Sequence, residues 1–220
     1  MFTNKIIIFG LNDLAELAHF YLTNHYFDTV KVVAFTVSEK YIKENTFKEL
    51  PVIPFEELDK HFNPSDYLLF APVTDNNLRE KVYREGKSKG YNFFSYISPK
   101  CTNYALSIGE NCFILEDNTL QPFTSIGNNV IMWSGNHIGH HSNIEANVFI
   151  SSHVVISGFV NVGMNSFLGV NSTISNNIKI GIDNWIGLGA TITRNTIDGA
   201  LFKGERSVAS EINSLEFFKI

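Results

Sequence analysis

Aliphatic residues recur at every sixth position along the C-terminal half of the chain. Stepping by six from Ile108 reaches Ile, Leu, Val or Met at fifteen successive positions, the last of which is Ile192. The next residue is often glycine, as at Gly109, Gly127 and Gly139. A period of six fits neither the 3.6-residue turn of a helix nor the two-residue alternation of a strand, but it fits a β-solenoid that stacks inward residues in columns. We therefore expect one short strand and one turn per hexad, with the aliphatic column as the core.

The N-terminal part alternates strand patterns with helical patterns. Residues 5–10 form an apolar run closed by glycine, and residues 11–22 follow with apolar positions at helical spacing. The other expected elements are strands at 30–35, 67–73 and 92–97 and a polar helix at 76–89. This alternation indicates a small parallel α/β sheet with Rossmann-like topology. Residues 98–100 mark a hinge, so the predicted domains are 1–98 and 99–220.

The hexad pattern resembles the left-handed parallel β-helix of hexapeptide-repeat acyltransferases, in which three hexads make one triangular coil. On this resemblance, residues 108–197 supply five coils, about 24 Å in length at an inter-strand spacing of about 4.8 Å. The handedness follows from the resemblance alone, because parallel crossovers are otherwise right-handed. With its first domain, the whole chain resembles the PglD/NeuD-like sugar acyltransferase family. The expected fold class is an α/β mini-Rossmann domain followed by an all-β left-handed parallel β-helix.

Composition excludes several kinds of partner. The chain has 17 basic and 22 acidic side chains and a net charge of −5, which gives no electrostatic footprint for nucleic acid or an anionic membrane. No apolar run approaches the roughly 18 residues of a membrane span, and residues 5–10 are too short for a signal peptide. We therefore expect a cytoplasmic protein. Cys101 and Cys112 lack a CxxC or Cys/His spacing, so a disulfide scaffold or structural zinc site is not expected.

The first strand-to-helix turn carries a weak dinucleotide fingerprint. In Gly10-x-Asn12-x-x-Ala15 an asparagine replaces the glycine that lets a backbone approach a pyrophosphate, and no carboxylate follows the second strand. NAD is therefore not expected. In the family the first domain helps to hold a nucleotide-linked sugar, and Asn76 and Arg79 match its Asn-x-x-Arg pattern. The resemblance implies substrate contacts by Gly10, Asn12, Asn76 and Arg79, whereas Arg79 as a solvated or capping residue is the alternative.

Four of the seven histidines lie within seventeen residues, at positions 137, 140, 141 and 153. His140 and His141 follow the inward Ile138 by two and three positions, so we expect both to point out of the core. The family places its general base in an Ile-x-His segment and, one coil later, a glycine whose N–H faces the thioester oxygen. His140 and Gly158 match that pattern in residue type and spacing.

The chemistry explains these residue types. An amine or hydroxyl that attacks acetyl-CoA must lose a proton, and imidazole, with a reference pKa near 6.5, can accept it near neutral pH. A prearranged N–H such as that of Gly158 stabilises the oxyanion of the intermediate. His141 stands where the family has an acidic residue and is placed in the catalytic group. Glu145, a carbonyl or another carboxylate is expected to orient the base, and His153 is assigned to the substrate.

Two other interpretations of the histidines remain open. Each histidine can be a hydrogen-bonding residue of a surface or an interface. His137, His141 and His153 can also hold zinc as in the γ-class carbonic anhydrases, which share the left-handed helix, although their spacing differs from that ligand pattern. We expect no metal.

The expected co-substrate is acetyl-CoA. In the family, pantetheine lies along the prism against backbone groups, and Gly187, Gly189 and Ala190 are small enough for that approach, although hexad turns favour glycine in any case. Lys203 and Arg206 stand where the family has Gly-x-Pro-Ala-Lys, and they are candidates for contacts to the CoA phosphates.

Two expectations concern the surface of the second domain. Residues 212–220 are expected to form a short capping helix. Phe149, Val155 and Phe167 are expected to point outward from the prism, and their burial between chains predicts a homotrimer.

The expected function is acetyl-CoA-dependent N-acetylation of a nucleotide-activated amino sugar in the biosynthesis of bacterial surface glycans such as lipopolysaccharide. The alternatives are a sugar O-acetyltransferase and a non-catalytic trimeric scaffold that binds sugar nucleotides.

Overall fold

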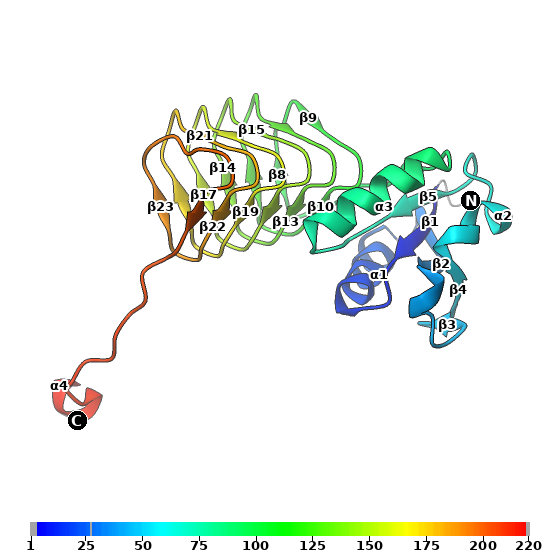
Figure 1. Ribbon diagram of the computed structural model, residues 1–220, viewed down its shortest axis with the longest axis horizontal. Helices are drawn as coiled ribbons and strands as arrows, with labels where there is room; N and C mark the ends of the chain where they lie inside the picture. The colour runs from blue at the N-terminus through cyan, green and yellow to red at the C-terminus, as the bar shows by residue number, and fades with distance from the viewer. Residues whose placement is uncertain (1–3, 27, 219–220) are drawn as a thin grey trace.

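The computed structural model describes residues 4–26 and 28–218. Figure 1 shows an α/β domain beside a prism of stacked coils, and an arm that leads from the last coil to the C-terminus. The α/β domain contains β1 Asn4–Phe9, α1 Asp13–His25, β2 Val30–Val37, β3 Thr46–Phe47, β4 Leu50–Pro54, α2 Leu58–His61, β5 Leu68–Phe70, α3 Asn76–Ser88 and β6 Asn92–Phe93, with short 3-10 turns at Glu39–Tyr41 and Phe55–Glu57.

The strands of the α/β domain form one mixed sheet in the order β3-β4-β2-β1-β5-β6. The central strand β1 is parallel to β2 and to β5. Ile6 and Ile8 belong to one hydrophobic core and Ile7 belongs to another, since alternate side chains of β1 point to opposite faces of the sheet. Both faces are therefore covered, which explains the unbroken apolar run in the sequence.

The hairpin of β3 and β4 was missed by the sequence pattern. Its turn residues Lys48 and Glu49 have φ values of 50° and 63°, in the left-handed region. Two-residue hairpin turns of this kind usually contain Asn or Gly, so Lys-Glu gives no recognisable turn signal. β4 also pairs in parallel with β2 and extends the sheet.

The prism has three faces, each a parallel sheet of two-residue strands. The first face contains β7 Tyr96–Ile97, β10 Phe113–Ile114, β13 Ile131–Met132, β16 Phe149–Ile150, β19 Phe167–Leu168, β22 Trp185–Ile186 and β24 Leu201–Phe202. The second face contains β8 Thr102–Asn103, β11 Thr119–Leu120, β14 His137–Ile138, β17 Val155–Ile156, β20 Thr173–Ile174 and β23 Thr191–Ile192. The third face contains β9 Ser107–Ile108, β12 Ser125–Ile126, β15 Asn143–Ile144, β18 Asn161–Val162 and β21 Lys179–Ile180.

Strands on a face pair between residues eighteen positions apart, as in Ile138 with Ile156. The predicted aliphatic column forms the core, because every one of its positions from Ile114 to Ile192 is buried. Only Ile108, at the start of the column, is partly exposed. The solenoid fold with one strand and one turn per hexad is therefore confirmed.

The change from sheet to prism lies inside the strand predicted at 92–97. β6 pairs with β5 in the α/β sheet, whereas β7 pairs with β10 in the prism. The prism therefore begins at Tyr96, ahead of the predicted boundary after residue 98. Stepping back by six from Ile108 reaches Thr102, which is exposed, so the hexad pattern does not mark these first strands.

The C-terminal segment does not cap the prism as predicted. After β24 the chain runs away from the last coil to α4, Ser214–Phe218, at the end of the arm (Figure 1). Ile212 and Leu215 of this segment are exposed and are not buried against a coil. Residues 219 and 220 lie outside the described residues. None of the helices in the described ranges is long and apolar enough to cross a bilayer.

The α/β domain covers the start of the first face. The ring of Tyr21 on α1 packs against Tyr96 and Phe113, and its hydroxyl donates to Glu116 at 2.9 Å. Phe149 is only 7% exposed as a result of this packing, so its predicted outward exposure is wrong.

Candidate active site

His140 lies at the corner between the second and third faces, where β14 turns toward β15; we call this the His140 corner. Ile138 is buried in the core, and the side chain of His140, two positions later, is exposed as predicted. The backbone N–H of His140 donates to Oε1 of Gln121 at 2.9 Å. This bond across adjacent coils fixes the backbone from which the imidazole projects.

Gly158 lies beneath the His140 imidazole, one coil further along the prism. A Cβ at position 158 would lie 2.9 Å from Cε1 and 3.0 Å from Nε2 of His140, so a side chain there would displace the ring from this position. The N–H of Gly158 donates to no acceptor among the residues that the structure describes. The fold thus places a free backbone donor beside an exposed imidazole.

The two neighbouring histidines contact each other. Nδ1 of His140 lies 3.0 Å from Nδ1 of His141, so one of the two nitrogens must donate to the other. If His140 donates, its Nε2 keeps a lone pair and can accept a proton. If His141 donates, Nε2 of His140 carries the hydrogen and cannot act as a base. The direction of this bond decides whether His140 is competent.

His141 is held by a stack of rings along the corner. Its φ of 59° lies in the left-handed region, and Phe123 and Phe159 occupy the same corner position in the adjacent coils. The ring centroids are 4.6 Å from Phe123 and 4.8 Å from Phe159, the latter nearly parallel. This stack fixes the orientation of His141 toward His140.

Glu145 does not orient the base. Its carboxylate accepts from Nδ2 of Asn161 at 2.9 Å and from the backbone N–H of Met164 at 3.1 Å. Both partners lie on the next coil, so Glu145 links two coils of the prism. The hydrogen-bond partner of the His140 imidazole is His141.

The other two histidines lie elsewhere. His137 belongs to β14 on the second face. His153 lies at the corner between the first and second faces, packed so closely on Gly135 that a Cβ there would be 2.5 Å from Nδ1. The structure therefore does not bring His153 to His140 within one chain. Across the described ranges no three His, Cys, Asp or Glu side chains form a group able to hold a metal.

The two residues of the first turn that were predicted to bind the nucleotide have roles in the backbone structure. Gly10 has a φ of 119°, which favours glycine, and lies at the end of β1. Oδ1 of Asn12 accepts from the N–H of Ala15 at 3.1 Å and thereby caps α1. Helix capping therefore accounts for an asparagine at position 12, and a contact between Asn12 and the substrate stays a prediction.

Arg79 cannot make the ligand contact that was predicted, because it is fully buried between the domains. Its Nε donates to the carbonyl oxygen of Asn129, and its other nitrogens donate to the carbonyls of Val73, Thr74 and Asn147 and to Oδ1 of Asn76. These bonds use all five donors of the guanidinium. Burial lowers the pKa of Arg79 to about 10, which still leaves it charged at neutral pH.

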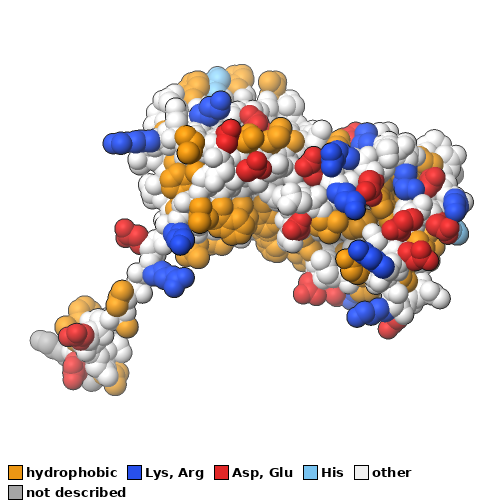
Figure 2. All heavy atoms as spheres, viewed as in Figure 1, with side chains coloured by type: hydrophobic (Ala, Val, Ile, Leu, Met, Phe, Trp, Pro, Cys, Tyr) orange, Lys and Arg blue, Asp and Glu red, His pale blue; other side chains and the backbone are white. Residues whose placement is uncertain are grey.

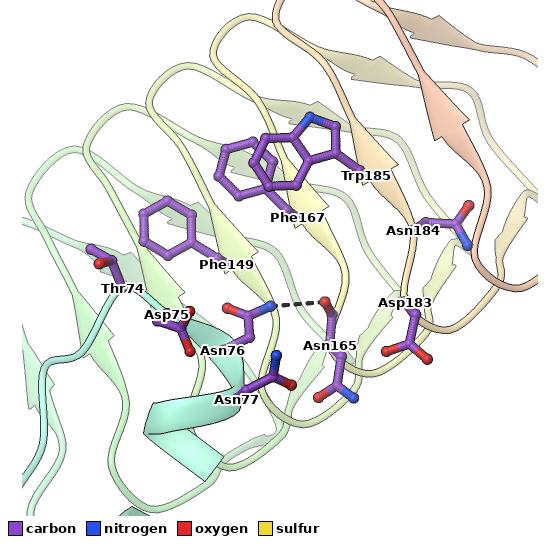
Figure 3. Close-up of a pocket in the computed structure, with 10 residues that line it drawn as sticks. All are labelled: Thr74, Asp75, Asn76, Asn77, Phe149, Asn165, Phe167, Asp183, Asn184 and Trp185. Carbon is purple, nitrogen blue, oxygen red and sulfur yellow. Dashed lines mark hydrogen bonds between the residues drawn. The ribbon is translucent and has the colours of Figure 1, made fainter. Parts of the chain in front are cut away.

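Asn76 lines a cavity of about 530 Å³ between the start of α3 and the first face (Figure 3). Its Nδ2 donates to the carbonyl oxygen of Asn165 at 2.8 Å. The other lining residues are Thr74, Asp75, Asn77, Phe149, Phe167, Asp183, Asn184 and Trp185. The sequence analysis missed Asp75 and Trp185, although the aromatic residues recur every eighteen positions on the first face.

The aromatic side chains at this cavity form a ladder along the first face. Phe149 and Phe167 stack at 5.4 Å, and Phe167 and Trp185 stack at 4.0 Å. Figure 2 shows hydrophobic side chains gathered along the prism between the α/β domain and the arm, in the region of these strands.

Most of the predicted CoA residues lie at the corner between the first and second faces, on the last coils. Gly189, Ala190 and Lys203 line a depression of about 460 Å³. A Cβ at Gly187 would lie 2.8 Å from the carbonyl oxygen of Phe202, so glycine is needed for this packing. Arg206 is exposed on the arm. The second face separates this depression from His140 within one chain.

These features define a two-domain protein in which a left-handed parallel β-helix follows an N-terminal mixed α/β sheet, the fold of hexapeptide-repeat acetyltransferases. No family model and no curated protein sequence matches the chain. Solved structures do match it. Perosamine N-acetyltransferase from Caulobacter crescentus, studied as a histidine-to-asparagine variant with CoA and GDP-perosamine, is similar over 90% of this chain and 92% of its own, with 21% identity and a TM-score of 0.77.

Two further structures share the fold. The acetyltransferase domain of PglB from Neisseria gonorrhoeae FA1090 matches with 18% identity and a TM-score of 0.79 over 90% of this chain and 95% of its own. WeeI from Acinetobacter baumannii AYE matches with 18% identity and a TM-score of 0.59 over 90% of this chain and 96% of its own. The left-handed helix and its position after the α/β domain are thereby confirmed.

Proposed function

We propose that this protein transfers the acetyl group of acetyl-CoA to the amine of a nucleotide-linked amino sugar, with His140 as general base. The observation that carries the proposal is the exposed His140 imidazole packed on Gly158, whose N–H has no protein acceptor in the described ranges. A base and a free amide donor at one point are what acyl transfer requires. The shared fold with acetyltransferases, one of them bound to CoA and GDP-perosamine, supports the same choice of substrates.

In the proposed reaction the amine nitrogen attacks the thioester carbonyl carbon. The C–N bond forms, the amine proton passes to Nε2 of His140, and the carbonyl oxygen becomes an oxyanion near the N–H of Gly158. The C–S bond then breaks, and the leaving thiolate of CoA takes the proton held by His140, which restores the free base. General base catalysis contributes about 10²–10⁴-fold and an oxyanion donor about 10²–10³-fold in rate.

His141 acts in this scheme as a positioning residue. By accepting from Nδ1–H of His140, its Nδ1 leaves the lone pair of the base on Nε2. An imidazole thus takes the place of the carboxylate that orients the base in the family that this chain resembles. The stack with Phe123 and Phe159 keeps His141 in position.

The carboxyl edge of the α/β sheet is the proposed site of the sugar nucleotide. Ligands of open α/β sheets bind at this edge, which here holds Gly10 and the segment 71–77 beside the cavity of Figure 3. The carboxylates of Asp75 and Asp183 at this cavity can accept hydrogen bonds from the hydroxyl groups of the nucleotide-linked sugar. The glycine-lined depression beside Lys203 is the proposed end of the CoA site.

A homotrimer belongs to this proposal. Along the His140 corner a single chain leaves Tyr104, Leu106, Phe123 and Phe159 between 52% and 75% exposed. Exposed apolar residues that gather at one edge mark an interaction surface. Parallel prisms packed there would cover the strip and enclose His140 in a cleft, and they would bring corners of different chains together.

The proposal is tested by CoA release from acetyl-CoA in the presence of UDP-, dTDP- and GDP-linked amino sugars, with the product analysed by mass spectrometry. We expect release with at least one of them and an acetamide on the sugar. An acetate ester would indicate O-acetylation, and the absence of release with the whole set would contradict an acetyltransferase of this class.

A further inference from the structure

The His140 corner ends in two cations that the sequence analysis did not assign. β14, β17, β20 and β23 stack in register, so Ile138 aligns through two intervening coils with Ile192. Arg194 follows Ile192 by two positions, as His140 follows Ile138. Arg194 therefore belongs to the same corner, three coils from the candidate base.

Lys179 accompanies Arg194 on the adjoining third face. It precedes the buried Ile180 in β21 and is exposed, in register with Asn161 and Asn143 of the two preceding coils. Neither cation forms an ion pair with any residue in the described part of the chain. Two unneutralised cations near one corner attract an anionic ligand group.

The His140 corner carries cations only toward its C-terminal end. From His140 toward the N-terminal end it carries Phe123, Leu106 and Tyr104, which have no charge. Toward the C-terminal end it passes Gly158 and leads to Arg194. A ligand with a thioester at one end and phosphates at the other is therefore oriented with its phosphates toward Arg194.

The distance along the corner fits such a ligand. Three coils at about 4.8 Å separate His140 from Arg194 by about 14 Å along the prism. The arm of CoA from the thioester sulfur to the first phosphorus has about thirteen bonds, which an extended chain of three bonds per 3.3–3.6 Å spans in about 15 Å. A thioester at His140 thus puts the diphosphate at Arg194.

On the basis of the proposed function, we propose that Arg194, with Lys179 beside it, binds the diphosphate of CoA and so fixes the co-substrate in the His140 corner. The arginine fork matches phosphate oxygens in a bidentate arrangement, which makes Arg194 the main contact and Lys179 the supporting charge. The contact determines specificity for CoA over acyl carriers without phosphates. Within one chain it lies one prism face away from the depression beside Lys203, so that depression borders the same CoA only from a neighbouring chain of the proposed trimer.

The test measures CoA affinity by isothermal titration calorimetry, independently of turnover. Arg194→Ala is expected to raise the Kd for CoA at least about tenfold, since a charge-assisted bidentate contact is lost. Lys179→Ala is expected to have a smaller effect in the same direction. The matched control is Arg84→Ala, because Arg84 is an exposed arginine on α3 that pairs with Glu80 and should leave the Kd unchanged.

Shorter ligands identify the group that is bound. Dephospho-CoA keeps the diphosphate, so Arg194→Ala should weaken it by the same factor as CoA. Acetyl-pantetheine has no diphosphate, so its kcat/KM should be equal in the variant and the wild type.

The outcomes separate this inference from the proposed function. An unchanged Kd for CoA in Arg194→Ala would overturn the phosphate contact while acetyl transfer by the wild type stands. If Arg194→Ala raised the Kd for CoA but not the Kd for dephospho-CoA, the assignment of Arg194 to the diphosphate would be overturned. CoA binding that depends on Arg194 without any acetyl transfer would support the contact and contradict the reaction. A wild type that does not bind CoA would overturn both.

Discussion

At the scale of single residues, the His140 imidazole is the group on which the proposed chemistry depends. His140→Ala or His140→Asn should lower kcat by about 10²–10⁴-fold, because the proton of the acceptor loses its base. The affinity for CoA should remain near that of the wild type, since His140 points away from the core. Steady-state kinetics at saturating substrates measure the loss. A variant that keeps more than about a tenth of wild-type kcat would exclude His140 as the base.

His141 offers a pair of substitutions that separate its two contacts. His141→Phe preserves the ring stack, because phenylalanine already occupies this corner position at Phe123 and Phe159, but it removes the acceptor for His140. His141→Asn keeps an acceptor and tolerates the φ of 59°. We expect a lower kcat for the Phe variant than for the Asn variant, at similar KM and stability. Equal kcat values in the two variants would show that the hydrogen bond does not orient the base.

The Cys112 thiol predicts a pH dependence of stability. Burial raises the pKa of this thiol from 9.0 to about 11. The folded state therefore favours the neutral thiol. The stability that this preference contributes is fully present below about pH 9 and is lost as the pH rises through about 11. In a Cys101→Ser background, we expect Cys112 to react with an aromatic disulfide reagent at pH 8 only at the rate of unfolding. Immediate labelling of Cys112 in the native protein would contradict its burial.

At the scale of elements, α3 is joined to the prism through Arg79. The guanidinium donates to carbonyls of two successive coils, at Asn129 and Asn147, and to the segment before α3. Arg79→Met leaves these buried carbonyls without donors, at about 1–3 kcal/mol for each group that remains dry. We expect the free energy of unfolding to fall by about 2–4 kcal/mol in urea titrations.

Arg79→Lys is the companion variant, because it keeps the charge but cannot span all the carbonyls. It should also lose stability. Unchanged stability together with weaker binding of a sugar nucleotide would restore the ligand role that the sequence suggested for Arg79.

At the scale of the whole molecule, the proposed trimer depends on the strip beside His140. Light scattering at micromolar concentration should give the mass of three chains of 24.8 kDa. Leu106→Glu should dissociate the trimer, because Leu106 is 75% exposed in a single chain and would bury its new charge between chains. Phe20→Glu on α1 is the matched control, since Phe20 is 56% exposed and remote from the strip. A wild-type mass of one chain would contradict both the trimer and a cleft between chains.

The sequence by itself determined the architecture of both domains. An inward position in a solenoid must be aliphatic in every coil, and the coil length is constant, so the column from Ile114 to Ile192 appears directly as a period of six. The same period placed His140 outside the core and Gly158 one coil away. The hairpin at 46–54 and the first strands of the prism were missed, because their turn residues and the exposed Thr102 carry no pattern.

Only the tertiary structure decided which partners the polar side chains have. Arg79 contacts carbonyls of the prism, and Glu145 contacts groups on the next coil. His141 contacts the neighbouring ring of His140, and the hexad period does not specify the direction of that ring. The register of the coils fixes which residues are adjacent, but burial and hydrogen bonding depend on the packing of the α/β domain against the prism. Arg79 is therefore buried although the local sequence is that of an exposed helix start, because the carbonyls that bind it come from residues 50 to 68 positions away.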